Sequence, residues 1–204
     1  MLELDTATLV GKGLHRECYE YPGDSTRCVK IVVAGNSDEN RREARYYQRL
    51  ARRRVSWDML SVFHGLEPTS RGEGAVFDLI RDYDGCVSQT LRHYLESQAR
   101  SASNDVILVG ALADLKVYLL RNRIVTMTLK SKNILLQKTA QDAGKLVIVD
   151  NVGNSDFIPL SNYIGSLARR KILRKWRRFE ADIQRQNPNN EVLPRLLPAV
   201  NVVR

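Results

Sequence analysis

The chain has 204 residues, 43% of them hydrophobic and 27% charged, so a packed core is expected and disorder is not. Its formal net charge of +9 favours anionic partners such as phosphates or acidic lipid, but does not choose among them. No apolar run approaches the roughly 20 residues that cross a bilayer. The first five residues are acidic and lack the basic and then apolar order of a signal peptide, so we expect a cytoplasmic protein without a transmembrane segment.

The three cysteines, Cys18, Cys28 and Cys86, are widely spaced and show no metal-ligand spacing. This pattern favours reduced structural thiols over a zinc site. No base-reading motif accompanies the positive charge, so no specific nucleic-acid partner is expected.

The N-terminal part of the sequence has strand patterns around one helix. Strands are predicted within residues 6–33, where alternating apolar positions place Lys30 on a definite face. A helix is expected from about 39 to 53, with apolar residues recurring at helical spacing. Two further strands are predicted at 60–66 and 74–80, around a glycine-containing turn.

The C-terminal part, after a break at 82–85, is dominated by helical patterns. Helices are expected at 88–99, 105–123 and 161–186. Residues 101–104 predict a loop and helix cap between the first two. A loop at 124–133 precedes a hairpin formed by 134–136 and 146–149, and the tail after the last helix is expected to be irregular. The order of elements predicts an α+β fold.

A glycine-containing turn between the first strands is the first candidate for chemistry. Gly11 and Gly13 would let the backbone approach a ligand and offer N–H groups to phosphates. His15, at the expected tip, is a candidate phosphate contact. A plain hairpin turn, with His15 in a capping or packing role, is the alternative.

Lys30 is the second candidate. A lysine within an apolar strand is most often the solvent-facing residue of an alternation. The functional alternative is a lysine that contacts nucleotide phosphates, which needs an acid to orient it. Glu43 on the following helix is that candidate acid, although an exposed glutamate among arginines would also be ordinary.

Two polar positions follow in the second half. Lys130 and Asn133 lie on one short loop between apolar flanks. Asp150 ends a fully apolar strand, a position that suits a metal ligand, although a strand-ending turn residue is the alternative.

In this order, these features resemble the protein-kinase superfamily. The family's catalytic loop reads H-R-D-L-x-x-x-N, and residues 126–133 match it with Thr128 at the aspartate and Asn133 at the asparagine. Asp150 takes the place of the metal-binding aspartate. Residues 76–80 resemble the strand and hinge that grip adenine, with Asp78 and Ile80 as the implied contacts.

The resemblance implies one small bilobal kinase-like domain that binds ATP and Mg²⁺. The strand-rich N-lobe would span about 1–82 and the helix-rich C-lobe about 83–204. Asn133 and Asp150 are the implied metal ligands. The implied nucleotide contacts are Gly11, Gly13, His15, Lys30, Glu43, Asp78 and Ile80.

A narrower resemblance is to the bacterial YrbL family, which is linked to the PhoP regulatory network. It rests on Gly-x-Gly-x-His-Arg-x-Cys-Tyr at 11–19, Cys-Val-Lys-Ile at 28–31, Arg-Arg-Glu at 41–43, residues 123–130 and Asp-Asn-Val-Gly at 150–153. The resemblance covers about residues 9–180 and implies a bacterial source.

The departures from the kinase pattern leave the reaction open. Thr128 is neutral and cannot replace an aspartate as base, and Arg16 stands where the phosphate loop has its third glycine. Lys130 could stabilise charge on a transferred group. An atypical phosphotransferase acting on a protein or small molecule, a pseudokinase that senses nucleotide or scaffolds a partner, and a nucleotidyl transferase are the three hypotheses.

A basic segment, residues 169–178, lies on the last expected helix. A solvated helix face is one interpretation. Contact with an anionic surface or phosphorylated partner is the other.

Overall fold

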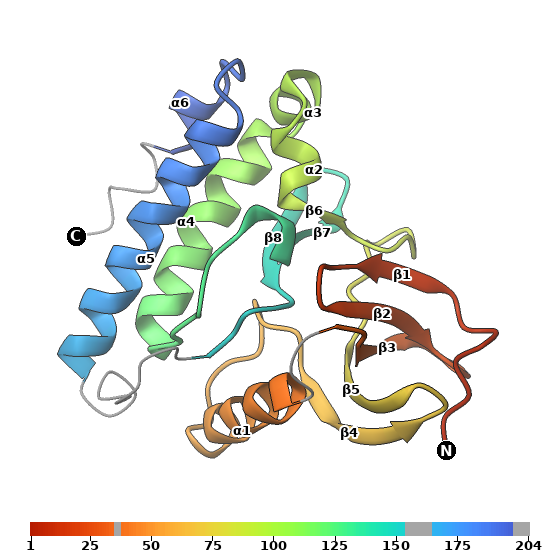
Figure 1. Ribbon diagram of the computed structural model, residues 1–204. Coiled ribbons are helices and arrows are strands. Elements are labelled where there is room, and N and C mark those ends of the chain that lie inside the picture. The colour runs from red at the N-terminus through yellow and green to blue at the C-terminus, as the bar shows by residue number, and fades with distance from the viewer. Residues whose placement is uncertain (35–37, 154–164, 198–204) are drawn as a thin grey trace. The chain divides into compact units, whose positions relative to one another are not determined.

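The computed structural model describes residues 1–34, 38–153 and 165–197 as a mixed α+β protein, which confirms the predicted fold class (Figure 1). The chain divides into two compact units. The first unit contains residues 1–57 and 61–81, and the second contains 58–60 and 82–204. The prediction of a single kinase-like domain, with lobes at about 1–82 and 83–204, stays a prediction.

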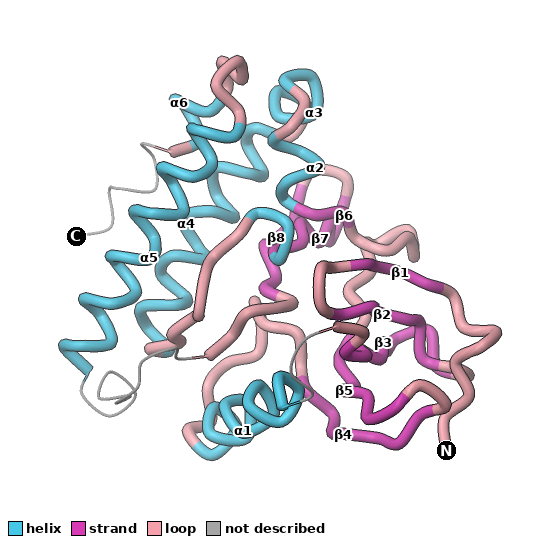
Figure 2. Tube along the Cα trace, in the orientation of Figure 1, coloured by secondary structure: helices cyan, strands magenta, loops and turns pink. Residues whose placement is uncertain are grey.

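The first unit is built on an antiparallel sheet with the strand order β1-β2-β3-β5-β4 in the described part (Figure 2). Its strands are β1 (Leu9–Lys12), β2 (Arg16–Tyr21), β3 (Asp24–Val32), β4 (Phe63–Thr69) and β5 (Gly72–Asp78). The predicted strands within 6–33 are confirmed. The strand predicted at 60–66 lies three residues before β4, and the strand predicted at 74–80 lies two residues after β5. The turn between them is shorter than the predicted one at 71–74, because it consists of Ser70 and Arg71.

Helix α1 (Asp38–Arg52) packs against β4 and β5, as its apolar spacing predicts. Tyr47 lies in an aromatic cluster between the helix and the sheet. Its ring centre is 5.2 Å from that of Phe77 and 5.9 Å from those of Phe63 and Trp57. The cluster fixes α1 on one face of the sheet.

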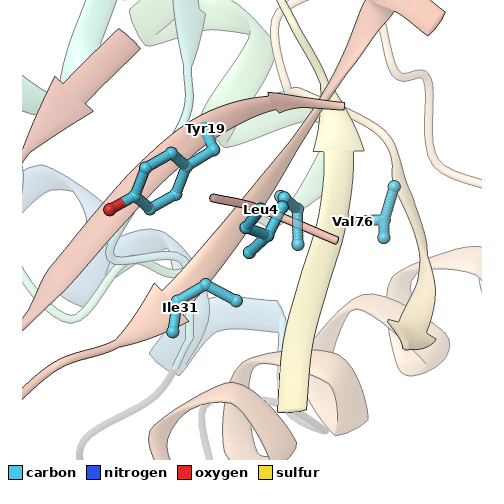
Figure 3. Close-up of a cluster of buried hydrophobic side chains, with 5 residues drawn as sticks. Leu4, Tyr19, Ile31 and Val76 are labelled. Atoms are coloured by element: carbon cyan, nitrogen blue, oxygen red, sulfur yellow. The ribbon is translucent and has the colours of Figure 1, made fainter. Parts of the chain in front are cut away.

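The N-terminal segment covers the opposite face of this sheet. Leu4 is fully buried and lies among Tyr19, Ile31 and Val76 (Figure 3). Backbone hydrogen bonds hold the segment in place, from Leu2 N to Pro68 O at 2.9 Å and from Ser70 N to Leu2 O at 2.9 Å. Alternate residues of β2 and β3 therefore enter two different environments.

The second unit combines helices with a small antiparallel sheet of order β6-β7-β8. Its helices are α2 (Leu91–Leu95), α3 (Gln98–Ser103), α4 (Asp105–Asn122), α5 (Gly165–Gln186) and α6 (Leu193–Leu196). Its strands are β6 (Gln89–Thr90), β7 (Ile134–Ala140) and β8 (Ala143–Ile148), and a short 3-10 helix, η1, covers Ser131–Asn133.

Helices α4 and α5 lie side by side, and α4 also contacts β8 and α6 (Figure 1). The apolar residues of α4 that recur at helical spacing are buried, as predicted. Trp176 and Phe179 of α5 are each 1% exposed. The hairpin β7–β8 confirms the prediction for 134–149.

The predicted single helix at 88–99 is wrong. Thr90 belongs to β6 and caps α2, since its hydroxyl accepts a hydrogen bond from His93 N at 3.1 Å. Ser97 then caps a separate helix by accepting from Arg100 N at 3.3 Å. The expected loop at 101–104 is also wrong, because α3 continues to Ser103. Two local caps therefore divide one apolar pattern into two helices.

The end of the chain differs in part from the prediction. The described portion of the last helix begins at Gly165, and the expected residues 161–164 lie outside the described residues. The tail contains the short helix α6, with a proline in its first turn. Among the described residues, no helix has the length and apolar character that a membrane span requires.

The short segment 58–60 belongs to the second unit. Leu60 forms a parallel bridge with Ile148, and Ile148 N donates to Met59 O at 3.0 Å. The chain thus enters the second unit once before it completes the first.

The three cysteines are reduced thiols outside any disulfide, as expected. A hydrogen bond with Cys18, followed by burial, raises the pKa of the Cys28 thiol above its ordinary value. A thiol with a raised pKa is a poor nucleophile at neutral pH, which fits a structural role for Cys28.

Candidate functional site

The glycine turn connects β1 to β2. Gly13 N donates to Arg16 O at 2.8 Å, and His15 O accepts from Val33 N at 2.8 Å. Gly11, Gly13 and His15 are exposed. A Cβ at Gly11 would meet only Cys18 Cβ, at 3.8 Å, so the fold itself does not require glycine there. The missing side chain leaves the backbone open to approach by a ligand.

Lys12 stands between the two glycines and is held by Glu17. Lys12 Nζ lies 2.9 Å from Glu17 Oε1, and Tyr19 OH donates to Glu17 Oε2 at 2.6 Å. The hydrogen bond from Tyr19, then that from Lys12, lowers the pKa of Glu17. The turn is therefore fixed to the sheet by side chains as well as by its backbone.

Lys30 is buried, so the expectation of a solvent-facing lysine is wrong. It is 7% exposed, and Nζ lies 4.1 Å from the centre of the Phe77 ring. Lys30 pairs with Cys18 on β2 and with Ala75 on β5. Its face of the sheet is covered by α1, which local alternation could not show.

Glu43 is also buried, at 4% exposed, and the alternative of an ordinary exposed glutamate is wrong. Its Oε2 atom lies 2.5 Å from Arg16 Nη1. Sequence reasoning assigned Glu43 to Lys30 and missed Arg16 as a partner. The strand period places Arg16 on the same face of β2 as Cys18, but no local pattern links Arg16 to Glu43.

Asp78 and Ile80, the predicted adenine contacts, lie at the end of β5 and just beyond it. Asp78 Oδ1 is 2.6 Å from His64 Nε2, and Oδ2 accepts from Val62 N at 3.3 Å. Ile80 is 9% exposed. The Asp78 carboxylate thus has partners within its own unit, and His64, to which the sequence assigned no role, is one of them.

Thr128 and Lys130 lie in the loop after α4. Both side chains are exposed, whereas Leu129 between them is 6% exposed and anchors the loop. The 3-10 helix η1 follows, with Asn133 N donating to Lys130 O at 2.9 Å. The loop therefore presents a hydroxyl and an ammonium group on a fixed backbone.

The segment 149–153 joins this loop. Val149 N donates to Asn133 O at 3.0 Å, and Met127 N donates to Asn151 O at 2.8 Å. Asn151 has a φ of 62°, and its side chain donates to the Thr128 hydroxyl at 3.3 Å. The second unit thereby brings the predicted loop with Thr128 and Asn133 next to the segment that carries Asp150.

The donor set of Asn133 and Asp150 suits a hard cation such as Mg²⁺, which prefers oxygen ligands. Asn133 is 9% exposed and supplies an amide oxygen, while Asp150 supplies a carboxylate. No group of three or more His, Cys, Asp or Glu side chains gathers as a metal site within the described part of the chain. Mg²⁺ commonly uses one or two carboxylates and completes its shell with phosphates and water.

Helix α5 carries the predicted basic segment. Within residues 169–178, the exposed arginines are Arg169, Arg170, Arg174, Arg177 and Arg178. Trp176 is buried and donates from Nε1 to Glu180 Oε1 at 2.7 Å. An anionic surface would thus contact the arginines, and Trp176 would not insert into it.

These observations define a mixed α+β protein in which one unit buries a lysine and a glutamate near a glycine turn, and the other gathers a polar loop cluster. The chain belongs to the YrbL family. The family described as PhoP regulatory network protein YrbL matches residues 2–184.

The chain is also similar to individual proteins of this family. It is 41% identical over 184 residues to the uncharacterized protein YrbL of Escherichia coli strain K12, covering 89% of this chain and 87% of that protein. The YrbL protein of Shigella flexneri gives the same identity and coverage. These relatives support the expected bacterial context.

Proposed function

We propose that this chain binds a nucleotide together with Mg²⁺ and acts as an atypical phosphotransferase in a PhoP-linked regulatory or envelope-stress role. The observation that carries the proposal is the loop cluster of the second unit. There, hydrogen bonds join two separate stretches, the loop with Thr128 and Asn133 and the segment 149–151 that contains Asp150. Such convergence of polar side chains on loops is typical of binding sites.

The first unit supplies the groups for the phosphates. Lys30 is buried on β3 with its ammonium group 4.1 Å from the centre of the Phe77 ring, and a lysine is seldom buried unless it has such partners. The turn at Gly11, Gly13 and His15 offers backbone N–H groups. Asp78 and Ile80 are proposed to lie against the base.

In the second unit, Asn133 and Asp150 would hold the metal, and bound Mg²⁺ would neutralise charge on the phosphates. Lys130 would stabilise charge on the transferred group. Phosphoryl transfer depends largely on positioning and electrostatics, so a missing base lowers the rate without abolishing it. The substrate would be a protein or a small molecule of the cytoplasm.

A pseudokinase that binds nucleotide without turnover is the second candidate. The contact from Asn151 to the Thr128 hydroxyl favours it, because a neutral hydroxyl that accepts a hydrogen bond is not a general base. A nucleotidyl transferase would use the same residues and leave an adenylyl product.

The test measures the melting temperature with and without Mg·ATP for the wild type, Lys30→Ala and Asp150→Ala. We expect a rise for the wild type and a reduced rise for both variants. Arg41→Gln is the matched control, because Arg41 forms an exposed ion pair with Glu73. Equal melting temperatures for the wild type with and without nucleotide would overturn the proposal.

Labelling with γ-phosphate-labelled ATP then separates the candidates. Transfer to the protein or an added substrate that is lost in Asp150→Ala supports a phosphotransferase. Binding without transfer supports the pseudokinase, and an adenylyl adduct in the mass spectrum supports nucleotidyl transfer.

The arginines of α5 add a partner to the proposal. Five exposed arginines within residues 169–178 favour an anionic surface by charge alone. Because Trp176 is buried, such contact would be electrostatic and sensitive to salt.

A further inference from the structure

Arg16 occupies a fixed position beside the glycine turn. It is the first residue of β2, and its carbonyl accepts the hydrogen bond from Gly13 N that closes the turn. On the other side, His15 O accepts from Val33 N at the end of β3. The side chain at position 16 therefore leaves the sheet at a defined point next to the exposed turn.

Glu43 holds the guanidinium of Arg16. Nη1 lies 2.5 Å from Glu43 Oε2, and the two side chains are 14% and 3% exposed. The start of α1 is itself tied to the sheet by Asn40, whose Nδ2 atom donates to Glu73 O at 3.1 Å and to Lys30 O at 3.4 Å. Helix α1 is thus held in place on the sheet, and Glu43 on this helix contacts Arg16 on β2.

The contact uses only one oxygen of the carboxylate. Glu43 Oε1 is buried and has no hydrogen-bond partner among the described residues. A buried arginine and carboxylate most often pair through two parallel hydrogen bonds, and an unsatisfied buried oxygen is costly. The unpartnered Glu43 Oε1 therefore calls for an explanation beyond the stability of the fold, such as a role at a binding site.

Arg16 and Lys30 lie on the same face of the sheet. Arg16 pairs with Val32 and Cys18 pairs with Lys30, so the two cations are diagonal neighbours on adjacent strands. Diagonal positions are about 7–8 Å apart at their Cα atoms. A planar arginine fork and a compact ammonium together suit phosphate oxygens, the first by bidentate hydrogen bonding and the second as a point charge.

We infer that Arg16 is a phosphate-binding residue for the terminal phosphates of a nucleoside di- or triphosphate, and that Glu43 positions its guanidinium. This inference rests on the proposed nucleotide-binding function. The arginine side chain would supply a contact at the place where the kinase-like loop has its third glycine. Glu43 acts through Arg16 and is a positioning residue.

The experiment measures affinity for adenosine, AMP, ADP and ATP with Mg²⁺ by calorimetry. Arg16→Gln should lower the affinity for ATP and ADP by about tenfold or more, and the affinity for adenosine by less than about twofold. Arg16→Lys should retain part of the preference for ATP, because it keeps the charge and loses the fork. Glu43→Gln should show an intermediate loss with the same dependence on phosphate number, and Arg41→Gln should match the wild type.

The outcomes separate this inference from the proposed function. If the wild type binds none of the four ligands, nucleotide binding itself fails. If the wild type binds ATP and the variants lose affinity equally for all four ligands, or lose none, then Arg16 and Glu43 form a purely structural pair. Should Arg16→Gln fail to fold, Arg16→Lys and Glu43→Gln give the same comparison.

Discussion

The side chain of Asn151 donates a hydrogen bond to the hydroxyl of Thr128 across 3.3 Å, although the two residues lie on separate segments of the second unit. Asn151 adopts a positive φ of 62°, which asparagine tolerates better than most residues. The contact joins the loop of Thr128 to the segment that contains Asp150, the residue before Asn151, in the cluster to which we assign the chemistry.

Placing a carboxylate at position 128 tests whether the missing general base limits the reaction. If the base is the missing component, Thr128→Asp should raise the rate of phosphate transfer by up to about 100-fold, since general base catalysis contributes about 10²–10⁴-fold. Thr128→Val is the matched control, with a similar shape and no hydroxyl, and should leave nucleotide affinity unchanged. A Thr128→Asp protein that transfers no faster than the wild type would show that other features limit the reaction.

Two glycines should respond in opposite directions to substitution by alanine. A Cβ at Gly74 would lie 2.4 Å from Val29 Cγ2 and 2.9 Å from Ile31 Cδ1, so Gly74→Ala should lower the free energy of unfolding by about 1–3 kcal/mol. Gly110 lies within α4, where an added Cβ meets nothing within 4 Å. Gly110→Ala should stabilise by about 0.5–1 kcal/mol. Urea unfolding of both variants measures the difference, and the same sign for both would contradict the packing described for β5.

The N-terminal segment should contribute strongly to stability through one side chain. Leu4 is fully buried against the sheet, so Leu4→Ala should lower the free energy of unfolding by about 2–5 kcal/mol. Leu14 is 80% exposed, and Leu14→Ala should change it by less than about 0.5 kcal/mol. Comparable denaturation midpoints for the two variants would show that the segment does not pack as described.

The network around Glu17 predicts a dependence of stability on pH. The folded protein lowers the pKa of Glu17 below its ordinary value of 4.5, mainly through the hydrogen bond from Tyr19. The stabilisation is therefore present above the unfolded pKa and is lost as pH falls towards the folded pKa. Glu17→Gln should make the free energy of unfolding less steep in pH between about 5 and 3. Identical slopes for variant and wild type in this range would rule out the contribution.

The arginine face of α5 predicts salt-sensitive binding to anionic surfaces. Replacing Arg170, Arg174, Arg177 and Arg178 by glutamine should reduce sedimentation with vesicles of acidic phospholipid, with little change in melting temperature because all four are exposed. If the wild-type protein does not sediment with acidic vesicles at low salt, the result would support the interpretation of α5 as a solvated helix face.

Elements with strong local patterns could be predicted from the sequence. The spacing of buried leucines in α4 and the paired apolar runs of β7 and β8 define those elements without reference to the rest of the chain. The division at Ser97 depends on a single capping hydroxyl, which the apolar pattern of 88–99 concealed. Helix boundaries of this kind depend on local competition that periodicity does not report.

The candidate site was harder to predict, because its contacts are non-local. The sequence located Lys30 and Glu43, but their burial depends on the packing of α1 against β4 and β5, and both were open to an exposed interpretation. The pairing of Arg16 with Glu43 joins residues 27 positions apart, so no local motif signals it. His64 and Asp78 also meet only through the register of β4 and β5.

The excursion of residues 58–60 into the second unit has a consequence for how the protein is made. During synthesis from the N-terminus, Met59 and Leu60 leave the ribosome long before Ile148, the residue that they contact. A cut between Arg81 and Asp82 would likewise place Met59 and Leu60 on the N-terminal fragment, although they pack in the second unit. Expression of either half alone should therefore give an aggregation-prone product. The two units should be expressed together as one chain.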